Sequence, residues 1–162
     1  MKTIITLLMS ICLLPNLKAQ QKITIADFEI LNNTNWKGTL TYKNYSDGKE
    51  VTLQTTMKIT LQGNKLISEI KFPQEPKANS TSKIKIRKNG TYFGDEKIIS
   101  KETFLDGATK IITLYMGKDN NRKAKMYKTY LFNRKAFSIT KEVEYLNSGE
   151  KIIRNKQLYK RI

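Results

Sequence analysis

The chain contains no histidine, and in 162 residues it has only one cysteine, Cys12. Without these side chains the main part of the chain cannot form a Ser-His-Asp triad, a Cys-His pair, an ordinary zinc site or a haem site ligated by histidine. Only carboxylate, lysine, tyrosine and hydroxyl chemistry remains. We therefore expect a protein that is not an enzyme and that uses neither a metal nor a cofactor.

Two pairs of carboxylates could serve a glycosidase, which needs two such groups beside the bond that it cleaves. Glu142 and Glu144 share one strand face with Ser138 and Thr140, which is typical of a solvated face. Asp95 and Glu96 follow a glycine, which indicates a turn or bulge. Residues 119–121 resemble part of a calcium loop but lack its later bidentate glutamate, so we interpret them as a turn. A carboxylate-based hydrolase is thus the least favoured function.

The first nineteen residues have the three-part pattern of a secretory signal peptide. Lys2 gives the basic start, residues 4–14 form the apolar stretch, and Ala19 is the small residue before the cut. The apolar stretch is too short to span a bilayer. We expect residues 1–19 to be cleaved from Gln20 and the protein to be secreted or periplasmic.

This cleavage would remove Cys12, for which the alternative is a lipid-anchored cysteine. Ile11 stands where a lipid-attachment site needs a small residue, so cleavage after Ala19 is favoured. The remaining 143 residues (162 minus 19) have the size of a single domain and can bury a core without disulfides. We expect one domain over residues 20–162 and a monomer.

The formal net charge is +16, and it falls to +14 once Lys2 and Lys18 are removed. The basic residues are 25 lysines against five arginines, although arginine is preferred for bidentate phosphate recognition, so no specific nucleic acid is expected. Two basic clusters stand out: Lys83, Lys85, Arg87 and Lys88, and Arg122, Lys123, Lys125 and Lys128. They could form a docking surface for an anionic partner. The favoured interpretation is a solvated face whose lysines discourage edge-to-edge aggregation.

Alternation of apolar and polar residues dominates the chain and predicts half-buried strands. In residues 50–61 every second residue is apolar except Thr55. Similar patterns predict further strands in residues 36–42, 66–72, 83–87, 92–104 with a bend at Gly94, 109–117, 123–132, 136–146 and 151–160. The turns between them contain Asn-Gly, Asp-Gly and similar pairs, which suit tight hairpins.

Short strands joined by regular turns predict an all-β fold, a single antiparallel up-and-down meander of about 8–9 strands. Closure into a barrel removes the unpaired edges, although a sandwich remains possible. Residues 23–31 fit either a short helical turn or an edge strand, and two prolines make residues 73–80 an irregular connection. Lysine and arginine on the polar faces favour an apolar interior over an outer-membrane barrel.

The segment FEILNNTNWKGTLTY, residues 28–42, resembles the first strand of calycin-like barrels, the group of lipocalins, fatty-acid-binding proteins and nitrobindin-like haem proteins. Leu31, Trp36 and Gly38 match its leucine, tryptophan and glycine. The closing segment NKQLYKRI, residues 155–162, is similar to the last strand of fatty-acid-binding proteins. The resemblance implies a calycin-like barrel.

The chain departs from each branch of that group. Lipocalins place the glycine before the tryptophan, fatty-acid-binding proteins insert two helices after the first strand, and the haem branch uses histidine. The segment WKGTLTYKNYSDGK, residues 36–49, also resembles small uncharacterised secreted proteins of Bacteroidetes type. That second resemblance implies no known activity.

A barrel of about eight strands is either packed with side chains or holds one small ligand. The candidate pocket residues are strand tyrosines and one arginine: Tyr42, Tyr115, Tyr130, Tyr145, Tyr159 and Arg154. Together they would suit a ligand with an apolar body and a polar head. The alternative for these residues is ordinary core packing, and Trp36 is expected to close one end of the barrel.

The leading functional hypothesis is noncovalent binding of a small apolar or amphipathic ligand. The alternative is a structural module of the cell envelope that docks anionic lipid or polysaccharide.

Overall fold

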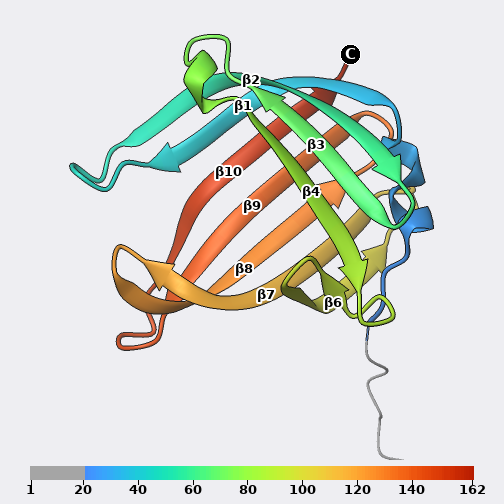
Figure 1. Cartoon of the computed structure of the whole chain (residues 1–162). Helices are drawn as coiled ribbons and strands as arrows, with labels where there is room; N and C mark the ends of the chain where they lie inside the picture. The colour runs from blue at the N-terminus through green and yellow to red at the C-terminus, as the bar shows by residue number, and fades with distance from the viewer. Residues whose placement is uncertain (1–20) are drawn as a thin grey trace, which may run out of the picture.

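The computed structural model describes residues 21–162. In this part the chain forms a closed barrel in the order β1-β10-β9-β8-β7-β6-β5-β4-β3-β2, with every neighbouring pair antiparallel (Figure 1). The all-β fold and its closure into a barrel are confirmed, with ten strands against the expected eight or nine. The predicted signal peptide, its cleavage site and Cys12 lie outside the described residues.

Each strand pairs with its neighbour in the chain, and β1 closes the barrel against β10. The strands are β1 (Thr34–Lys43), β2 (Glu50–Gln62), β3 (Lys65–Lys71), β4 (Ser80–Arg87), β5 (Tyr92–Phe93), β6 (Glu96–Thr103), β7 (Thr109–Asp119), β8 (Arg122–Phe132), β9 (Ala136–Tyr145) and β10 (Lys151–Arg161). Two short 3-10 helices accompany them, η1 (Ile25–Leu31) and η2 (Pro76–Ala78). No helix in residues 21–162 is long and apolar enough to cross a membrane.

Three local expectations can be compared with this structure. The region of residues 23–31 contains the helix η1 and no edge strand, and the proline-rich connection between β3 and β4 contains η2. The single strand expected over residues 92–104 is two strands, β5 and β6. They are separated by Gly94, whose φ of 63° lies in the left-handed region that glycine adopts most readily.

The closing seam of the barrel depends on a glycine. Gly38 of β1 pairs with Tyr159 of β10. A Cβ atom built on Gly38 would lie 1.9 Å from the carbonyl oxygen of Leu158 and 2.8 Å from the Tyr159 ring. Only a residue without a side chain allows this approach of the two strands.

The helix η1 covers one end of the barrel (Figure 1). Its Phe28 stacks on Phe93 of β5 at a centroid distance of 5.2 Å and on Phe132 of β8 at 5.5 Å. Trp36 is fully buried in the same core and donates its indole N–H to Thr34 Oγ1 at 2.7 Å, while the Thr34 hydroxyl bonds to the carbonyl of Leu31. This hydrogen-bonded chain ties the start of β1 to η1.

The wall is incomplete between β4 and β7. The two-residue strand β5 pairs with only Ile86 and Arg87 of β4, and the pairing of β6 with β7 extends no further along β7 than Leu114. Among residues 21–162, the first half of β4 therefore has no pairing with β5, and the residues of β7 after Leu114 have no pairing with β6. The ribbons of β4 and β7 diverge in Figure 1. Ser82 of β4 is exposed and Tyr115 of β7 is half-exposed on the two sides of this interruption.

Candidate ligand-binding cavity

A cavity of about 360 Å³ lies inside the barrel. Its apolar wall comes from β2 to β5, η1 and β9 and consists of Phe28, Met57, Leu66, Ile70, Ile84, Phe93, Phe137 and Ile139. Its polar wall comes mainly from β7 to β10 and consists of Tyr115, Lys128, Tyr130, Lys141, Asn155 and Gln157, with Ser68 and Ser82 on the opposite side. The volume and the mixed lining are typical of a small-molecule site.

Glu96 is the centre of a hydrogen-bond network that holds Lys128 and Tyr130 of the polar wall. Its Oε2 accepts from the Thr113 hydroxyl at 2.6 Å and from the Tyr130 hydroxyl at 3.2 Å, and its Oε1 accepts from Lys128 Nζ. Burial is the main cause that raises the pKa of Tyr130 well above its ordinary value, and the charge of Glu96 adds to it. The network therefore holds a neutral phenol and a matched pair of opposite charges.

Lys128 was expected on a basic surface, and the structure corrects this. Its ammonium group forms an ion pair with Glu96, and its side chain lines the cavity. The reason is strand periodicity: Lys128 lies two residues from Met126 and from Tyr130, both buried, so all three point to the same side of β8.

Lys141 lies directly opposite Lys128 in the pairing of β8 with β9 and also lines the cavity. Among residues 21–162 it has no carboxylate within ion-pair distance. Desolvation by burial lowers the pKa of Lys141, and the positive charges of Lys128 and Arg154 lower it further. Asp119 and Glu96 act in the opposite direction.

A second polar network lies where the β7–β8 and β9–β10 hairpins meet the loop after β1. Asp119 is 2% exposed and accepts from the Tyr45 hydroxyl at 2.6 Å and the Tyr145 hydroxyl at 2.7 Å. Arg154 Nε lies 3.3 Å from Asp119 Oδ1, and the Arg154 guanidinium also bonds to the carbonyl of Lys43 and stacks on the Tyr45 ring. This buried ion pair is saturated by its neighbours, which is typical of a structural role.

The six predicted pocket residues are divided among different regions of the barrel. Tyr115 and Tyr130 line the cavity, whereas Tyr145 and Arg154 bind Asp119. Tyr159 is buried near the aromatic core, with its ring centroid 6.3 Å from that of Phe137. The remaining residue, Tyr42, is half-buried and pairs with Val51 and Asn155 without lining the cavity.

The other predicted basic residues occupy three settings. Lys83, Lys85 and Arg87 alternate on the exposed face of β4, and Lys88 lies over the Tyr92 ring in the turn that follows. Lys123 is exposed, whereas Arg122 stacks on the Tyr145 ring and Lys125 bonds to Glu144 at 3.1 Å. Of the two predicted basic clusters, therefore, only the one on β4 forms a continuous exposed row of basic side chains.

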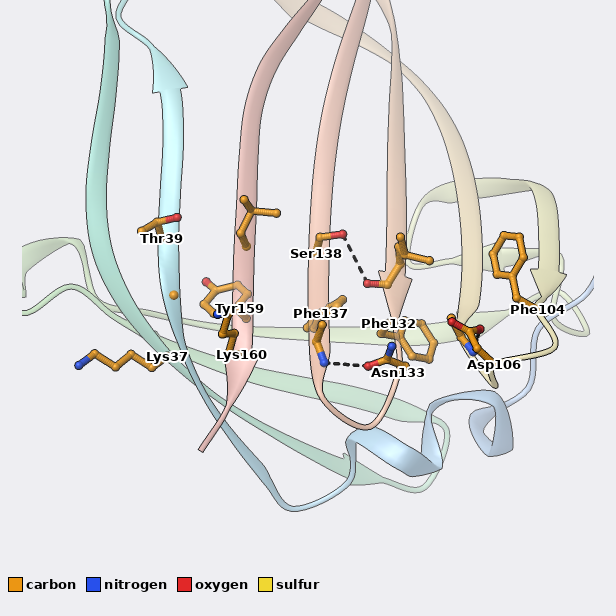
Figure 2. Close-up of a pocket in the computed structure, with 15 residues that line it drawn as sticks. Lys37, Thr39, Phe104, Asp106, Phe132, Asn133, Phe137, Ser138, Tyr159 and Lys160 are labelled. Atoms are coloured by element: carbon orange, nitrogen blue, oxygen red, sulfur yellow. Dashed lines mark hydrogen bonds between the residues drawn. The ribbon is translucent and has the colours of Figure 1, made fainter.

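A second hollow, of about 600 Å³, lies at the wall formed by β1, β10, β9 and β8, near the turn that joins β6 to β7. Figure 2 shows Thr39 on β1 and Ser138 on β9 facing this hollow, with Phe104 on the far side in the turn after β6. Leu131 and Leu158 also contribute and are exposed. This hollow differs from the interior cavity because no buried charged group lines it.

The polar wall includes two charged residues, Lys128 and Lys141, that were not among the predicted pocket residues, although the sequence carries a signal for both. Lys141 interrupts the row Phe137, Ile139, Val143 and Tyr145, and Lys128 interrupts the row Ala124, Met126, Tyr130 and Phe132. A charged residue within an inward row of a strand indicates a polar interior. Residues 21–162 contain no cluster of three or more potential metal ligands.

Comparison with known proteins assigns the chain to no characterised group. No protein-family model matches it, and no curated protein does. Among solved structures, it is similar to a protein of unknown function from the DUF3598 family of Nostoc punctiforme, with 15% sequence identity and a TM-score of 0.40 over 87% of this chain. The match covers 50% of that protein, so the chain spans about half its length. Membership of the calycin group stays a prediction.

Proposed function

We propose that the barrel binds a small amphipathic molecule noncovalently in its interior cavity. The single observation that carries this proposal is the division of the lining into an apolar wall around Ile84 and a polar wall around Lys141. A barrel that served only as a stable scaffold would gain more from filling this space, because voids inside proteins are costly. The absence of histidine supports binding over catalysis as the function.

Two measurements test this proposal. Native mass spectrometry of the protein purified from its own cells should show a noncovalent adduct. In addition, the neutral dye N-phenylnaphthylamine should become fluorescent in the purified protein. Ser68→Phe should abolish the dye signal, because Ser68 lines the cavity and a phenyl ring would fill it. Thr81→Phe, on the exposed side of neighbouring β4, is the matched control. Absence of both adduct and dye binding would refute the proposal.

A second candidate is docking to an anionic lipid or polysaccharide of the cell envelope. The observation that favours it is the exposed row Lys83, Lys85 and Arg87 on β4. Weak attraction between exposed charges is screened by salt. Sedimentation with anionic vesicles that persists at high salt, and that is lost in the triple lysine- and arginine-to-glutamine variant, would support this candidate.

We further propose that the protein acts outside the cytoplasm after removal of residues 1–19. The basis is the sequence pattern of the first nineteen residues. N-terminal sequencing of the exported protein should begin at Gln20. A start at Met1 would contradict this proposal.

A further inference from the structure

The charges inside the barrel do not balance. Lys128 is neutralised by Glu96, Arg154 by Asp119, and Lys101 by Asp27 at 2.6 Å. Lys141 is the cavity-lining charge that has no ion-pair partner among residues 21–162. The cavity lining therefore carries one excess positive charge.

An unpaired positive charge in a partly buried site is unfavourable, and here a second lysine lies directly opposite it across the two strands. The position gives no benefit to packing, because a methionine or leucine at 141 would continue the inward apolar row of β9. A charge held under these conditions suits a ligand that supplies the missing opposite charge. Buried charges in proteins are normally paired.

We infer that the ligand of the cavity is an amphipathic anion with a single negative charge, whose head group lies between Lys141, Asn155 and Gln157 and whose apolar body lies against β2 to β5. This inference rests on the proposed function and specifies the ligand class. Asn155 and Gln157 supply amide donors beside the ammonium group, all on the lining of the same cavity. Binding of a single negative charge would bring the net charge of the lining to zero.

The two ends of such a ligand match the two walls. Ile70 and Ile84 are half-exposed, and Leu66, Met57 and Phe93 are buried behind them, so an apolar body would cover surface that water now reaches. Burial of apolar surface contributes about 25 cal/mol per Å². Ser82 on β4 is exposed and Tyr115 on β7 is half-exposed, and both line the cavity where the wall lacks a strand. The ligand would enter there.

The test compares ten-carbon probes that share a tail and differ in the head group. Decanoate and decanesulfonate carry one negative charge, decanol is neutral, and decyltrimethylammonium is positive. Titration calorimetry, or displacement of N-phenylnaphthylamine, gives each affinity. We expect both anions to bind roughly 10- to 100-fold more tightly than decanol. This ratio of affinities equals the usual free-energy contribution of one hydrogen bond to a charged group. The cation should bind more weakly than decanol.

Lys141→Met keeps most of the side-chain length and removes the charge, so it should lower the affinity for decanoate to that for decanol while decanol still binds. Lys141→Arg should retain the preference for anions. Lys156→Met is the matched control, because Lys156 lies on the exposed face of β10 between Asn155 and Gln157 and should leave all affinities unchanged. Circular dichroism and the midpoint of thermal unfolding verify that each variant is folded.

The outcomes separate the two proposals. If decanol or the cation binds as tightly as decanoate, or if Lys141→Met leaves the preference for anions unchanged, the inference about charge is wrong while ligand binding stands. If neither the dye nor any ten-carbon probe binds, the proposed function and this inference are both overturned.

Discussion

The Tyr145 hydroxyl donates a hydrogen bond of 2.7 Å to Asp119, a carboxylate that is 2% exposed. The two residues lie on β9 and at the end of β7, and the other Asp119 oxygen accepts from Tyr45, in the loop between β1 and β2. One carboxylate therefore joins three hairpins, β1–β2, β7–β8 and β9–β10, and the first of these is far from the other two in the sequence. Loss of this carboxylate should affect the whole fold.

Asp119→Asn should lower the free energy of unfolding by about 3–5 kcal/mol, the usual cost of removing one partner of a buried ion pair. The substitution leaves Arg154, which is 8% exposed, without its counter-charge. Urea denaturation followed by tryptophan fluorescence measures the effect. Asp95→Asn is the control, because the Asp95 side chain is 92% exposed and its ion pair with Arg87 lies on the surface. Equal effects of the two substitutions would contradict a structural role for Asp119.

Alkaline titration provides a second prediction. Burial, together with the hydrogen bond to Asp119, raises the pKa of Tyr145 from 10.0 to about 12. In the unfolded chain Tyr145 ionises near its ordinary pKa. The stabilisation is therefore complete below pH 10 and is lost as the pH rises from there to about 12. Stability curves measured across this range should fall less steeply for Tyr145→Phe. An identical fall in the variant would contradict the assignment.

Gly38→Ala should destabilise the barrel by about 3 kcal/mol, at the upper end of ordinary overpacking. The added methyl group would lie 1.9 Å from a backbone oxygen of β10, which cannot move without opening the seam. Thermal unfolding measures the loss. Gly117→Ala is the control, because the nearest atom to a Cβ there is the flexible end of Met126 at 3.4 Å. A wild-type melting temperature for Gly38→Ala would show that β1 and β10 are not tightly joined.

Anion binding should depend on pH through Lys141. The pKa of Lys141 in the free protein lies below 10.5, and a bound anion would raise it by favouring the ammonium form. Affinity for decanoate should therefore be constant near neutral pH, where the probe is fully ionised, and fall as the pH rises through the pKa of free Lys141. Tyr115 and Tyr130, which share the cavity, have pKa values raised above 10.0 by burial, so both remain protonated longer.

Four other charged groups lie around Lys141, and they form two ion pairs: Lys128 with Glu96, and Arg154 with Asp119. Calorimetry from pH 7 upward, in buffers of different ionisation enthalpy, detects the proton uptake. Lys141→Met should show neither the fall in affinity nor the uptake. A pH-independent affinity in the unaltered protein would exclude Lys141 as the head-group contact.

Much of the fold followed from local patterns. Alternation in residues 50–61 predicted β2, and Asn-Gly and Asp-Gly pairs marked turns, because a strand with one buried face must alternate and tight turns need positive φ. Thr55 interrupted the apolar row and is nonetheless 1% exposed, so the periodicity was a better guide to burial than the chemistry of the side chain. The bend expected at Gly94 is a break between two strands, of which β5 pairs with β4 and β6 pairs with β7.

The arrangement of the site was not available from local patterns. A register shift in β10 between Ile153 and Asn155 brings Arg154 to Asp119 while Asn155 lines the cavity, although neighbouring strand residues ordinarily point to opposite faces. The position of each tyrosine along the barrel axis depends on the register between strands, which the sequence does not give. For this reason four of the five tyrosines expected to share one pocket are divided between the cavity, the Asp119 network and the aromatic core, and Tyr42 lies in none of these regions.

By itself the sequence determined most of the strands, their up-and-down order and the absence of histidine chemistry, because these depend on neighbouring residues and composition. Only the tertiary structure decided which charges meet. Glu96 and Lys128 are 32 residues apart, and their ion pair forms because β6, β7 and β8 lie side by side. Among residues 21–162 the same pairing leaves Lys141 without an ion-pair partner. The net charge of the cavity is the sum of side chains from strands that only the closed barrel brings together.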